Sequence, residues 1–176
     1  GYLYAPYYGN PGLQAERSNS AELGLQWAAA GQRLRATLFK TRVSDEIDYD
    51  FNTGTFSNIA RTRNQGLELS YGGEVRGHQV NASLTAQQPE DELTGDQRLR
   101  RSRTLASLAV SRPLPGGWRM GMAARYASAR PDSGGASLSS YTVLDLTTQW
   151  DITAQWQWFA RIENAFNASY QTAANY

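Results

Sequence analysis

The fold is decided by two adjacent stretches near the end of the chain, YTVLDLTTQW (residues 141–150) and QWQWFARIE (residues 155–163). Apolar and polar residues alternate in both. The apolar positions are Leu144, Leu146 and Trp150 in the first stretch and Trp156, Trp158, Ala160 and Ile162 in the second. A β-strand points successive side chains to opposite faces, so each stretch predicts a strand with one apolar and one polar face.

The connection between these strands, residues 151–154, is short, and tryptophans stand on both sides of it. Tryptophans around a tight turn are typical of the aromatic girdle at a membrane–water interface. A ligand-binding aromatic cage is the alternative interpretation of the tryptophans. A soluble sheet with one buried face has the same alternation, so this hairpin alone leaves both classes open.

Six earlier stretches alternate in the same way. Their apolar positions are Ala21, Leu23, Leu25 and Trp27; Leu34, Ala36 and Leu38; Leu67, Leu69 and Tyr71; Val80, Ala82, Leu84 and Ala86; Thr104, Ala106, Leu108 and Val110; and Trp118, Met120, Met122, Ala124 and Tyr126. The second of these strands is expected to continue to about Tyr49, beyond the bilayer. No stretch has the period of a helix, so the sequence predicts an all-β chain of eight strands.

The connections between these strands alternate in length. Short turns are expected near Gly31, Gly73, Pro115 and Thr153, and long connections at residues 7–18, 50–62, 88–103 and 130–140 and after Asn164. Strict alternation is typical of an up-and-down outer-membrane barrel, with short periplasmic turns and long outer loops. A soluble sandwich has Greek-key connections and no such regularity. The pattern therefore predicts an antiparallel up-and-down transmembrane β-barrel segment in the bacterial outer membrane.

Composition agrees with this class. The formal net charge of +1 gives no reason to expect a nucleic-acid partner, and the absence of cysteine excludes thiolate metal sites, thiol catalysis and disulfides. The mean hydropathy is −0.57, and no apolar run approaches the roughly 20 residues of a transmembrane helix. The chain starts and stops abruptly, without a signal peptide, so we expect a piece of a longer protein.

The polar faces carry charges of both signs. These are Glu22, Arg33, Arg35, Glu68, Arg119, Arg125, Asp145, Arg161 and Glu163. Inward charges need water or a counter-charged plug. Eight strands alone make a narrow tube that its own side chains fill, so we expect one arc of a wider barrel.

Four segments, in order along the chain, resemble TonB-dependent outer-membrane receptors. They are NPGLQAERS (10–18), similar to the family's N-P-x-L-x-P-E-x-S loop with Ala15 in place of the second proline; VSDEIDY (43–49); NQGLE (64–68); and IENAFNASY (162–170), similar to E-N-L-F-D-x-x-Y. The resemblance implies a monomeric 22-stranded barrel in the lipid bilayer and lipopolysaccharide, with TonB acting through a plug. It implies that residues 1–176 are the carboxyl-terminal portion of the barrel domain, without the plug, the early strands or the last strand.

The segment YQTAANY (170–176) resembles the cobalamin-receptor branch of this family, and the arginine-rich LRR (99–101) does so too. The resemblance implies uptake of cobalamin or another corrinoid and places ligand contacts at Arg100 and Tyr176. Alternatives are a ferric-siderophore or haem receptor and a passive porin-type channel. Tyr176 could equally be an ordinary loop residue.

The densest charge cluster contains Arg98, Arg100, Arg101 and Arg103. Arginines at a receptor mouth can donate to carboxylates, carboxamides or phosphates of a ligand. The alternative is pairing with lumen carboxylates or with acidic residues of the same loop, which are Glu90, Asp91, Glu92 and Asp96.

An enzyme is not expected, because the single histidine, His78, lies in a short turn on the periplasmic side, away from acidic residues. No resident cofactor is expected, since cobalamin would be cargo. Asp45, Asp48 and Asp50 have alternating spacing but lack the glycine and distal glutamate of an EF-hand. By the resemblance, calcium is possible only in loops outside this chain.

Overall fold

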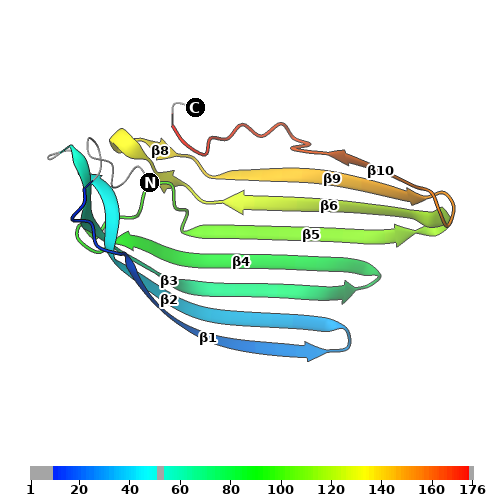
Figure 1. Cartoon of the computed structure of the whole chain (residues 1–176). Helices are drawn as coiled ribbons and strands as arrows, with labels where there is room; N and C mark the ends of the chain where they lie inside the picture. The colour runs from blue at the N-terminus through cyan, green and yellow to red at the C-terminus, as the bar shows by residue number, and fades with distance from the viewer. Residues whose placement is uncertain (1–9, 51–53, 175–176) are drawn as a thin grey trace.

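The computed structural model describes residues 10–50 and 54–174, apart from the side chain of Asp50. Eight strands form one antiparallel sheet whose spatial order is β1-β2-β3-β4-β5-β6-β9-β10 (Figure 1). The strands are β1 (Arg17–Ala29), β2 (Gln32–Asp50), β3 (Thr55–Val75), β4 (His78–Asp91), β5 (Thr104–Leu114), β6 (Trp118–Ala127), β9 (Tyr141–Asp151) and β10 (Gln157–Ile162). The predicted eight-strand, up-and-down architecture is confirmed.

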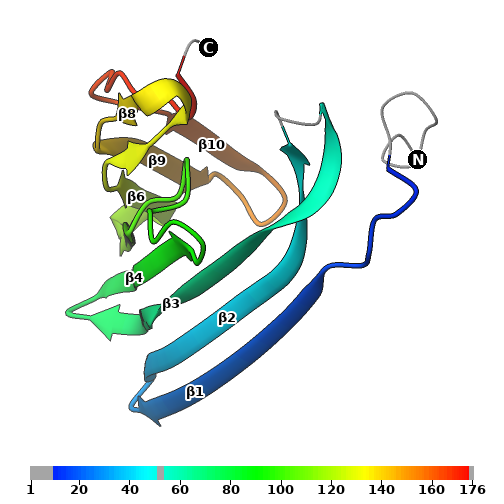
Figure 2. The same cartoon turned by 90° about the vertical axis from the view of Figure 1, so that its left-hand side faces the viewer.

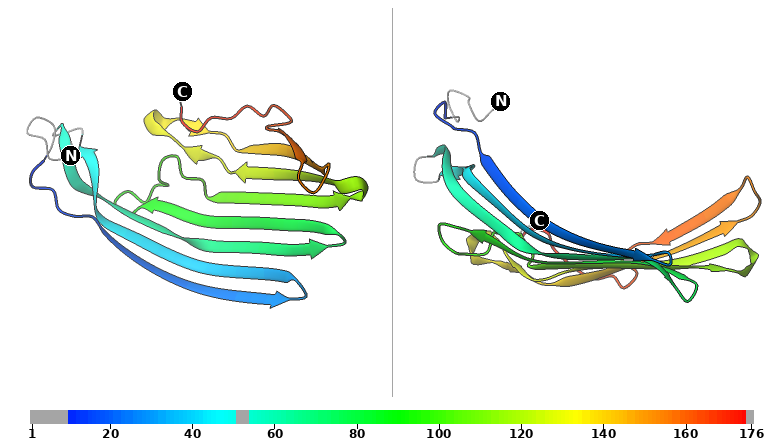
Figure 3. Two further views of the ribbon diagram at one scale, coloured as in Figure 1. Left: turned by 45° about the vertical axis from the view of Figure 1, so that its right-hand side comes forward. Right: turned by 90° about the horizontal axis from the view of Figure 1, so that it is seen from below.

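The sheet is a single curved layer, as Figures 2 and 3 show, with β1 and β10 at its two edges. Within the described residues, no helix is long and apolar enough to cross a membrane. A curved wall with two open edges is the shape expected of an arc of a larger barrel.

Strand register aligns the alternating apolar residues into a continuous belt. Leu23 lies opposite Leu38, which lies opposite Leu67 on β3. The same face continues through Val110 opposite Met122 to the last strand pair. Because opposite residues in an antiparallel pair share a face, one whole face of the sheet is apolar, as the sequence predicts. We call it the outer face, and the other the inner face.

The short turns gather at one end of the sheet, on the right in Figure 1. In the turn between β1 and β2, Ala30 and Gly31 have φ of 49° and 74°, which are the two positive values that a twisted hairpin needs. Trp118 and Trp150 stack at this end with ring centroids 5.1 Å apart, and the indole Nε1 of Trp150 donates to the Gly116 carbonyl at 3.1 Å. The predicted aromatic girdle is therefore a packed cluster beside the turns.

The prediction of a long connection at residues 50–62 is wrong. The strands β2 and β3 continue as a paired hairpin as far as Asp50 opposite Thr55, with a bulge between Val43 and Ile47. Asp45 has φ of 57° at this bulge. The hairpin extends beyond the apolar belt, where both faces meet water, so its residues no longer alternate in polarity. Periodicity therefore fails as a strand signal here.

Three further boundaries differ from expectation. The strand β4 extends to Asp91, beyond the expected loop start at residue 88. The expected loop 130–140 contains a small hairpin of β7 (Arg130–Pro131) and β8 (Ser137–Leu138) around the 3₁₀ turn η3 (Ser133–Gly135). Trp156 precedes β10 and belongs to the turn, where its carbonyl accepts from the amides of Ile152 and Thr153.

Candidate ligand-binding rim

Three connections meet at the end of the sheet opposite the short turns. They are residues 92–103 between β4 and β5, the β7–β8 connection between β6 and β9, and residues 163–174 after β10 (Figure 1). We call this end the outer rim. Since outer-membrane barrels place long connections outside the cell, the outer rim is the side from which an external ligand would arrive.

Asp132 joins all three connections. Its Oδ1 accepts from Arg100 Nε at 2.6 Å and from the Ser133 amide at 2.8 Å. Its Oδ2 accepts from the Ala174 amide at 2.5 Å. The Arg100 amide also donates to the Pro131 carbonyl at 2.8 Å. One carboxylate thus holds residues that are far apart in the sequence.

Asp132 is almost completely buried, with 2% of its surface exposed. The Ala174 amide, followed by the Arg100 guanidinium and the Ser133 amide, lowers the pKa of the Asp132 carboxyl to about 2. Donors that hydrogen-bond the charged form of a carboxyl stabilise that form. The group therefore remains ionised, and its bond to Arg100 charge-assisted, at every physiological pH.

Arg130 makes a second attachment for the segment after β10. It is 5% exposed, its Nη2 donates to the Gln171 carbonyl at 2.7 Å, and its guanidinium lies 5.5 Å from the centroid of the Tyr141 ring. Tyr141 in turn stacks on Tyr170 with centroids 4.4 Å apart. The segment is thus fixed by a cation–π contact, a ring stack and hydrogen bonds.

Of the two predicted ligand contacts, Arg100 lies on the outer rim and Tyr176 lies outside the described residues. The Arg100 side chain is half-exposed although its Nε is bound to Asp132. Its Nη atoms make no hydrogen bond to another described residue. Arg100 has φ of 60°, an unusual conformation for a non-glycine residue, which the Asp132 contact and the Pro131 carbonyl hold in place.

The arginine cluster is partly neutralised, but by different partners from those expected in its own loop. Arg98 pairs with Glu46 of β2 at 2.6 Å, and Arg100 pairs with Asp132. Arg101 and Arg103 have no ion pair within the part of the chain that the structure describes. The expected acidic partners Glu90 and Glu92 instead pair with two arginines of β2 and β3, Arg42 and Arg63.

Asp132 and Arg130 were not expected from sequence. They lie in a Gly- and Ser-rich stretch without periodicity, and the only signal was a basic and an acidic residue on either side of a proline. An open groove of about 650 Å³ is lined by Asp96, Gln97 and Leu99 on one side and by the β7–β8 connection on the other. This groove gives the rim space beside Arg100 for a bound molecule.

Below the rim, Asp145 organises the inner face. It is 1% exposed and accepts from Arg161 Nη2 at 2.7 Å and from the Asn164 amide at 3.0 Å. Arg125 approaches it to 3.1 Å. Of the predicted inward charges, Arg125, Asp145 and Arg161 therefore pair across the neighbouring strands β6, β9 and β10. Asp145 also fixes the start of the segment that Asp132 holds at its end.

His78 is the first residue of β4, and its Nδ1 lies 3.2 Å from the Arg76 carbonyl. Among the described residues there is no group of three or more histidine, cysteine, aspartate or glutamate side chains that could hold a metal ion.

A curved antiparallel sheet with an apolar outer face, a charged inner face, a tryptophan cluster beside short turns and long connections at the opposite rim is the wall of an outer-membrane β-barrel. Residues 1–165 match the family model described as TonB dependent receptor-like, beta-barrel, and the chain belongs to this family. The members of this family are outer-membrane transport receptors and not enzymes.

Curated relatives include the vitamin B12 transporter BtuB of Vibrio vulnificus, 30% identical over 97% of this chain and 28% of that protein. The BtuB of Vibrio cholerae is 25% identical over 98% of this chain and 29% of that protein. The chain thus spans less than a third of the length of these relatives.

Solved structures show the same fold at low identity. The ferric-catecholate import receptor Fiu from E. coli K12 has a TM-score of 0.78 and 19% identity over 99% of this chain and 26% of its own. The copper transporter OprC has a TM-score of 0.78 and 17% identity over 97% of this chain and 29% of its own.

Proposed function

We propose that this chain is the carboxyl-side arc of a TonB-dependent receptor that takes up cobalamin or a related corrinoid. The chain supplies barrel wall, aromatic girdle and part of the outer rim. The plug and the remaining strands belong to the rest of the receptor. Ligand binds at the outer rim, and TonB, acting on the plug, drives its release to the periplasm.

The observation that carries the choice of ligand is the 30% identity to a vitamin B12 transporter over 97% of this chain. The likeness to the solved siderophore and copper receptors is 22% identity or less, and it supports the fold alone. The TonB-dependent family match weighs against a passive porin. A ferric-siderophore receptor is the remaining alternative.

The rim geometry supports Arg100 as a donor to the ligand. Its Nε is anchored by Asp132 at 2.6 Å, so the guanidinium is oriented before a ligand arrives. The side chain is 49% exposed, which leaves its Nη groups able to donate. Corrinoids carry carboxamide side chains and a phosphate, and both are acceptors that a guanidinium bonds well. A pre-oriented donor loses less side-chain entropy on binding than a mobile one.

The test measures binding of cyanocobalamin, of a ferric siderophore and of Cu²⁺ to the complete receptor. Quenching of tryptophan fluorescence reports the binding. Cyanocobalamin is expected to bind saturably and the other two not. Arg100→Ala is expected to weaken cobalamin binding by about tenfold or more, since a hydrogen bond to a charged group contributes about 1.5–3 kcal/mol. Tyr176→Ala is expected to weaken it as well.

Arg33→Ala is the matched control, because Arg33 is an exposed inner-face cation at the short-turn end of β2. It is expected to leave affinity unchanged. Saturable binding of an iron chelate alone would remove the cobalamin assignment while leaving the family untouched. Cobalamin binding that survives both Arg100→Ala and Tyr176→Ala would remove the two residues from the site.

A further inference from the structure

A small pocket of about 280 Å³ lies on the inner face of the sheet, under the connection between β4 and β5. The rim ends of β2, β3 and β4 form its floor, where Thr41 lies opposite Asn64 and Asn64 lies opposite Pro89. Arg98 and Arg101 of the connection line its other side. The pocket is separate from the groove beside the β7–β8 connection, since the two have no lining residue in common.

The connection is held against β4 on both sides of Arg101. The Arg98 amide donates to the Pro89 carbonyl at 2.9 Å, and the Gln87 amide donates to the Arg103 carbonyl at 2.8 Å. The backbone of Arg101 is therefore fixed beside the pocket before a ligand arrives. Its side chain is exposed, and it makes no ion pair with any residue that the structure describes.

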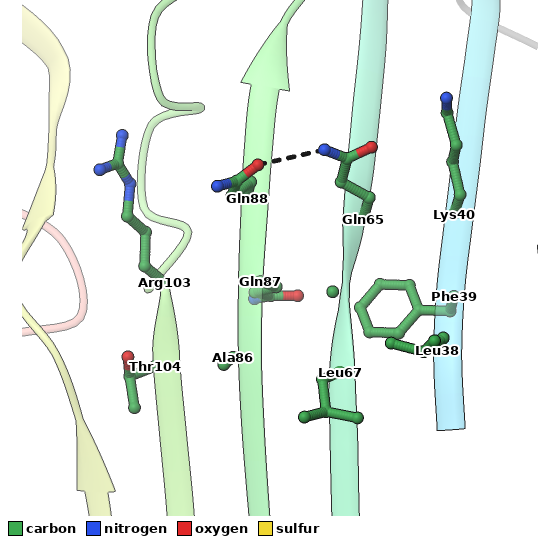
Figure 4. Close-up of a pocket in the computed structure, with 11 residues that line it drawn as sticks. Leu38, Phe39, Lys40, Gln65, Leu67, Ala86, Gln87, Gln88, Arg103 and Thr104 are labelled. Carbon is green, nitrogen blue, oxygen red and sulfur yellow. Dashed lines mark hydrogen bonds between the residues drawn. The ribbon is translucent and has the colours of Figure 1, made fainter. Parts of the chain in front are cut away.

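Asn64 presents a lone acceptor in this pocket. The Ser102 carbonyl can only accept, so the side-chain nitrogen of Gln87 faces it, at 2.8 Å. Gln87 extends from β4 toward β3 (Figure 4), and its Oε1 accepts from Asn64 Nδ2 at 2.9 Å. This chain of bonds fixes the orientation of the Asn64 amide. Its Oδ1 is buried and has no hydrogen-bond partner within the described part of the chain, which is unfavourable until a donor enters.

The pocket thus combines an acceptor that needs a donor with cations that need an acceptor. Arg98 is partly occupied, because its Nη2 donates to Glu46 Oε1 at 2.6 Å, whereas the guanidinium of Arg101 is available. A primary carboxamide satisfies both needs, since its NH₂ donates and its carbonyl oxygen accepts. A carboxylate or a phosphate would suit the arginines but would set an oxygen against Asn64 Oδ1.

We propose that Asn64 and Arg101 form a subsite for one carboxamide side chain of the cargo. The subsite rests on the proposed corrinoid ligand, which carries such carboxamides, and it adds a second attachment to Arg100. Arg100 bonds to Asp132 of the β7–β8 connection, while the pocket lies toward β2 and β3. A ligand held at both points lies across the β4–β5 connection. Asn64 then determines specificity, because an analogue without the N–H leaves its buried oxygen unpaired.

The test measures the affinity of the complete receptor for cyanocobalamin and for its separated monocarboxylic acids, in each of which a different carboxamide is hydrolysed. Quenching of tryptophan fluorescence reports the binding. One acid is expected to bind the unaltered receptor about tenfold more weakly than cyanocobalamin, because its carboxylate meets Asn64 Oδ1.

In Asn64→Leu, cyanocobalamin is expected to bind about fivefold more weakly, the usual effect of one lost hydrogen bond between neutral groups. The same acid is expected to bind this variant at least as well as cyanocobalamin does. Such a cycle between residue and ligand separates a direct contact from a structural effect, which would weaken all the ligands alike.

Arg101→Leu is a second variant, and it leaves the sheet intact because Arg101 is an exposed residue of a connection. Cyanocobalamin is expected to bind it about tenfold more weakly, since the lost hydrogen bond comes from a charged donor. The acid singled out by Asn64→Leu is expected to lose still more. Arg101→Gln keeps an N–H donor and is expected to restore part of the affinity.

Asn81→Leu is the matched control, because Asn81 is an exposed asparagine on the inner face of β4, opposite Gly72 near the short-turn end. All affinities are expected to stay unchanged in it. If Asn64→Leu changes the relative affinity of no acid, water fills the pocket and the subsite is refuted, and an equal change in the control refutes it too. If the unaltered receptor does not bind cyanocobalamin, the corrinoid assignment fails and the subsite fails with it. Cyanocobalamin binding without an effect of Asn64 or Arg101 removes the subsite alone.

Discussion

Among the glycines of the described residues, Gly66 has the least room for a side chain. It lies on β3 between Phe39 of β2 and Gln87 of β4. A Cβ added to Gly66 would press against the Ala86 carbonyl oxygen, and it would lie 2.9 Å from Gln87 Cα and 3.0 Å from Phe39 Cζ. Two of these three atoms are backbone. The substitution Gly66→Ala therefore cannot be relieved by a side-chain rotation alone.

The strand that would have to move, β4, is paired with β3 on one side and β5 on the other. Overpacking of this kind costs about 1–3 kcal/mol. Replacing glycine by alanine also stabilises by about 0.4–1 kcal/mol, because it reduces the freedom of the unfolded chain. We expect Gly66→Ala to lower the free energy of unfolding by about 1–2 kcal/mol.

The measurement is urea-induced unfolding of the complete receptor in lipid vesicles, followed by tryptophan fluorescence. Gly24→Ala is the matched control on the same face of β1, since its Cβ would meet Thr37 Oγ1 at 3.7 Å and the Ala36 carbonyl at 3.9 Å, which are ordinary contacts. The control is expected to be neutral or slightly stabilising. If both variants unfold at the same urea concentration, the close approach at Gly66 has no energetic consequence and the reasoning is refuted.

Two further outcomes are expected. In Asp132→Asn, the Ala174 amide should exchange with deuterium faster than in the unaltered receptor. In the unaltered receptor, the Ala174 amide should stay protected from exchange between neutral pH and about pH 4, and this protection should be lost as the pH falls toward 2. The sign follows from a folded-state pKa of about 2 against an ordinary value of 3.8: a lowered carboxyl pKa contributes stability above the ordinary value and loses it below the folded one. Loss of protection already at pH 6 would contradict this. Trp118→Leu removes a stack with Trp150 and should cost about 0.5–1.5 kcal/mol beyond the lost apolar area, measured by the same urea unfolding, whereas an unchanged midpoint would mean that the stack contributes nothing.

The sequence predicts this fold well wherever lipid contacts the sheet. Lipid on one side and a polar lumen on the other impose a period of two, and Leu23, Leu38 and Leu67 align as their alternation requires. Beyond the bilayer the constraint disappears. Above the bulge at Asp45, the expected continuation of β2 to about Tyr49 is confirmed, but the β3 half of the hairpin has no regular alternation, so the sequence predicts a loop at residues 50–62 where the structure has a strand.

The rim could be predicted only in part. The arginine cluster lies at the rim, but the sequence does not show its partners, because they are far away along the chain. Arg100 meets a carboxylate 32 residues later, and Asp132 meets the Ala174 amide 42 residues further on. Such contacts depend on which connections the barrel brings together. No local sequence pattern predicts these contacts.

The two nearly buried aspartates act in the same way at two heights of the wall. Asp145 holds Arg161 and the Asn164 amide on the inner face, and Asp132 holds Arg100 and the Ala174 amide at the rim. The segment after β10 is therefore fixed at both ends by carboxylates that also orient arginines. Arg100 and the Ala174 amide are thus linked through one carboxylate although they are far apart in the sequence, and Ala174 stands two residues before Tyr176, the other proposed ligand contact. Disturbing Asp132 should thus affect both contacts together, whereas disturbing Asp145 should act on the segment without displacing Arg100.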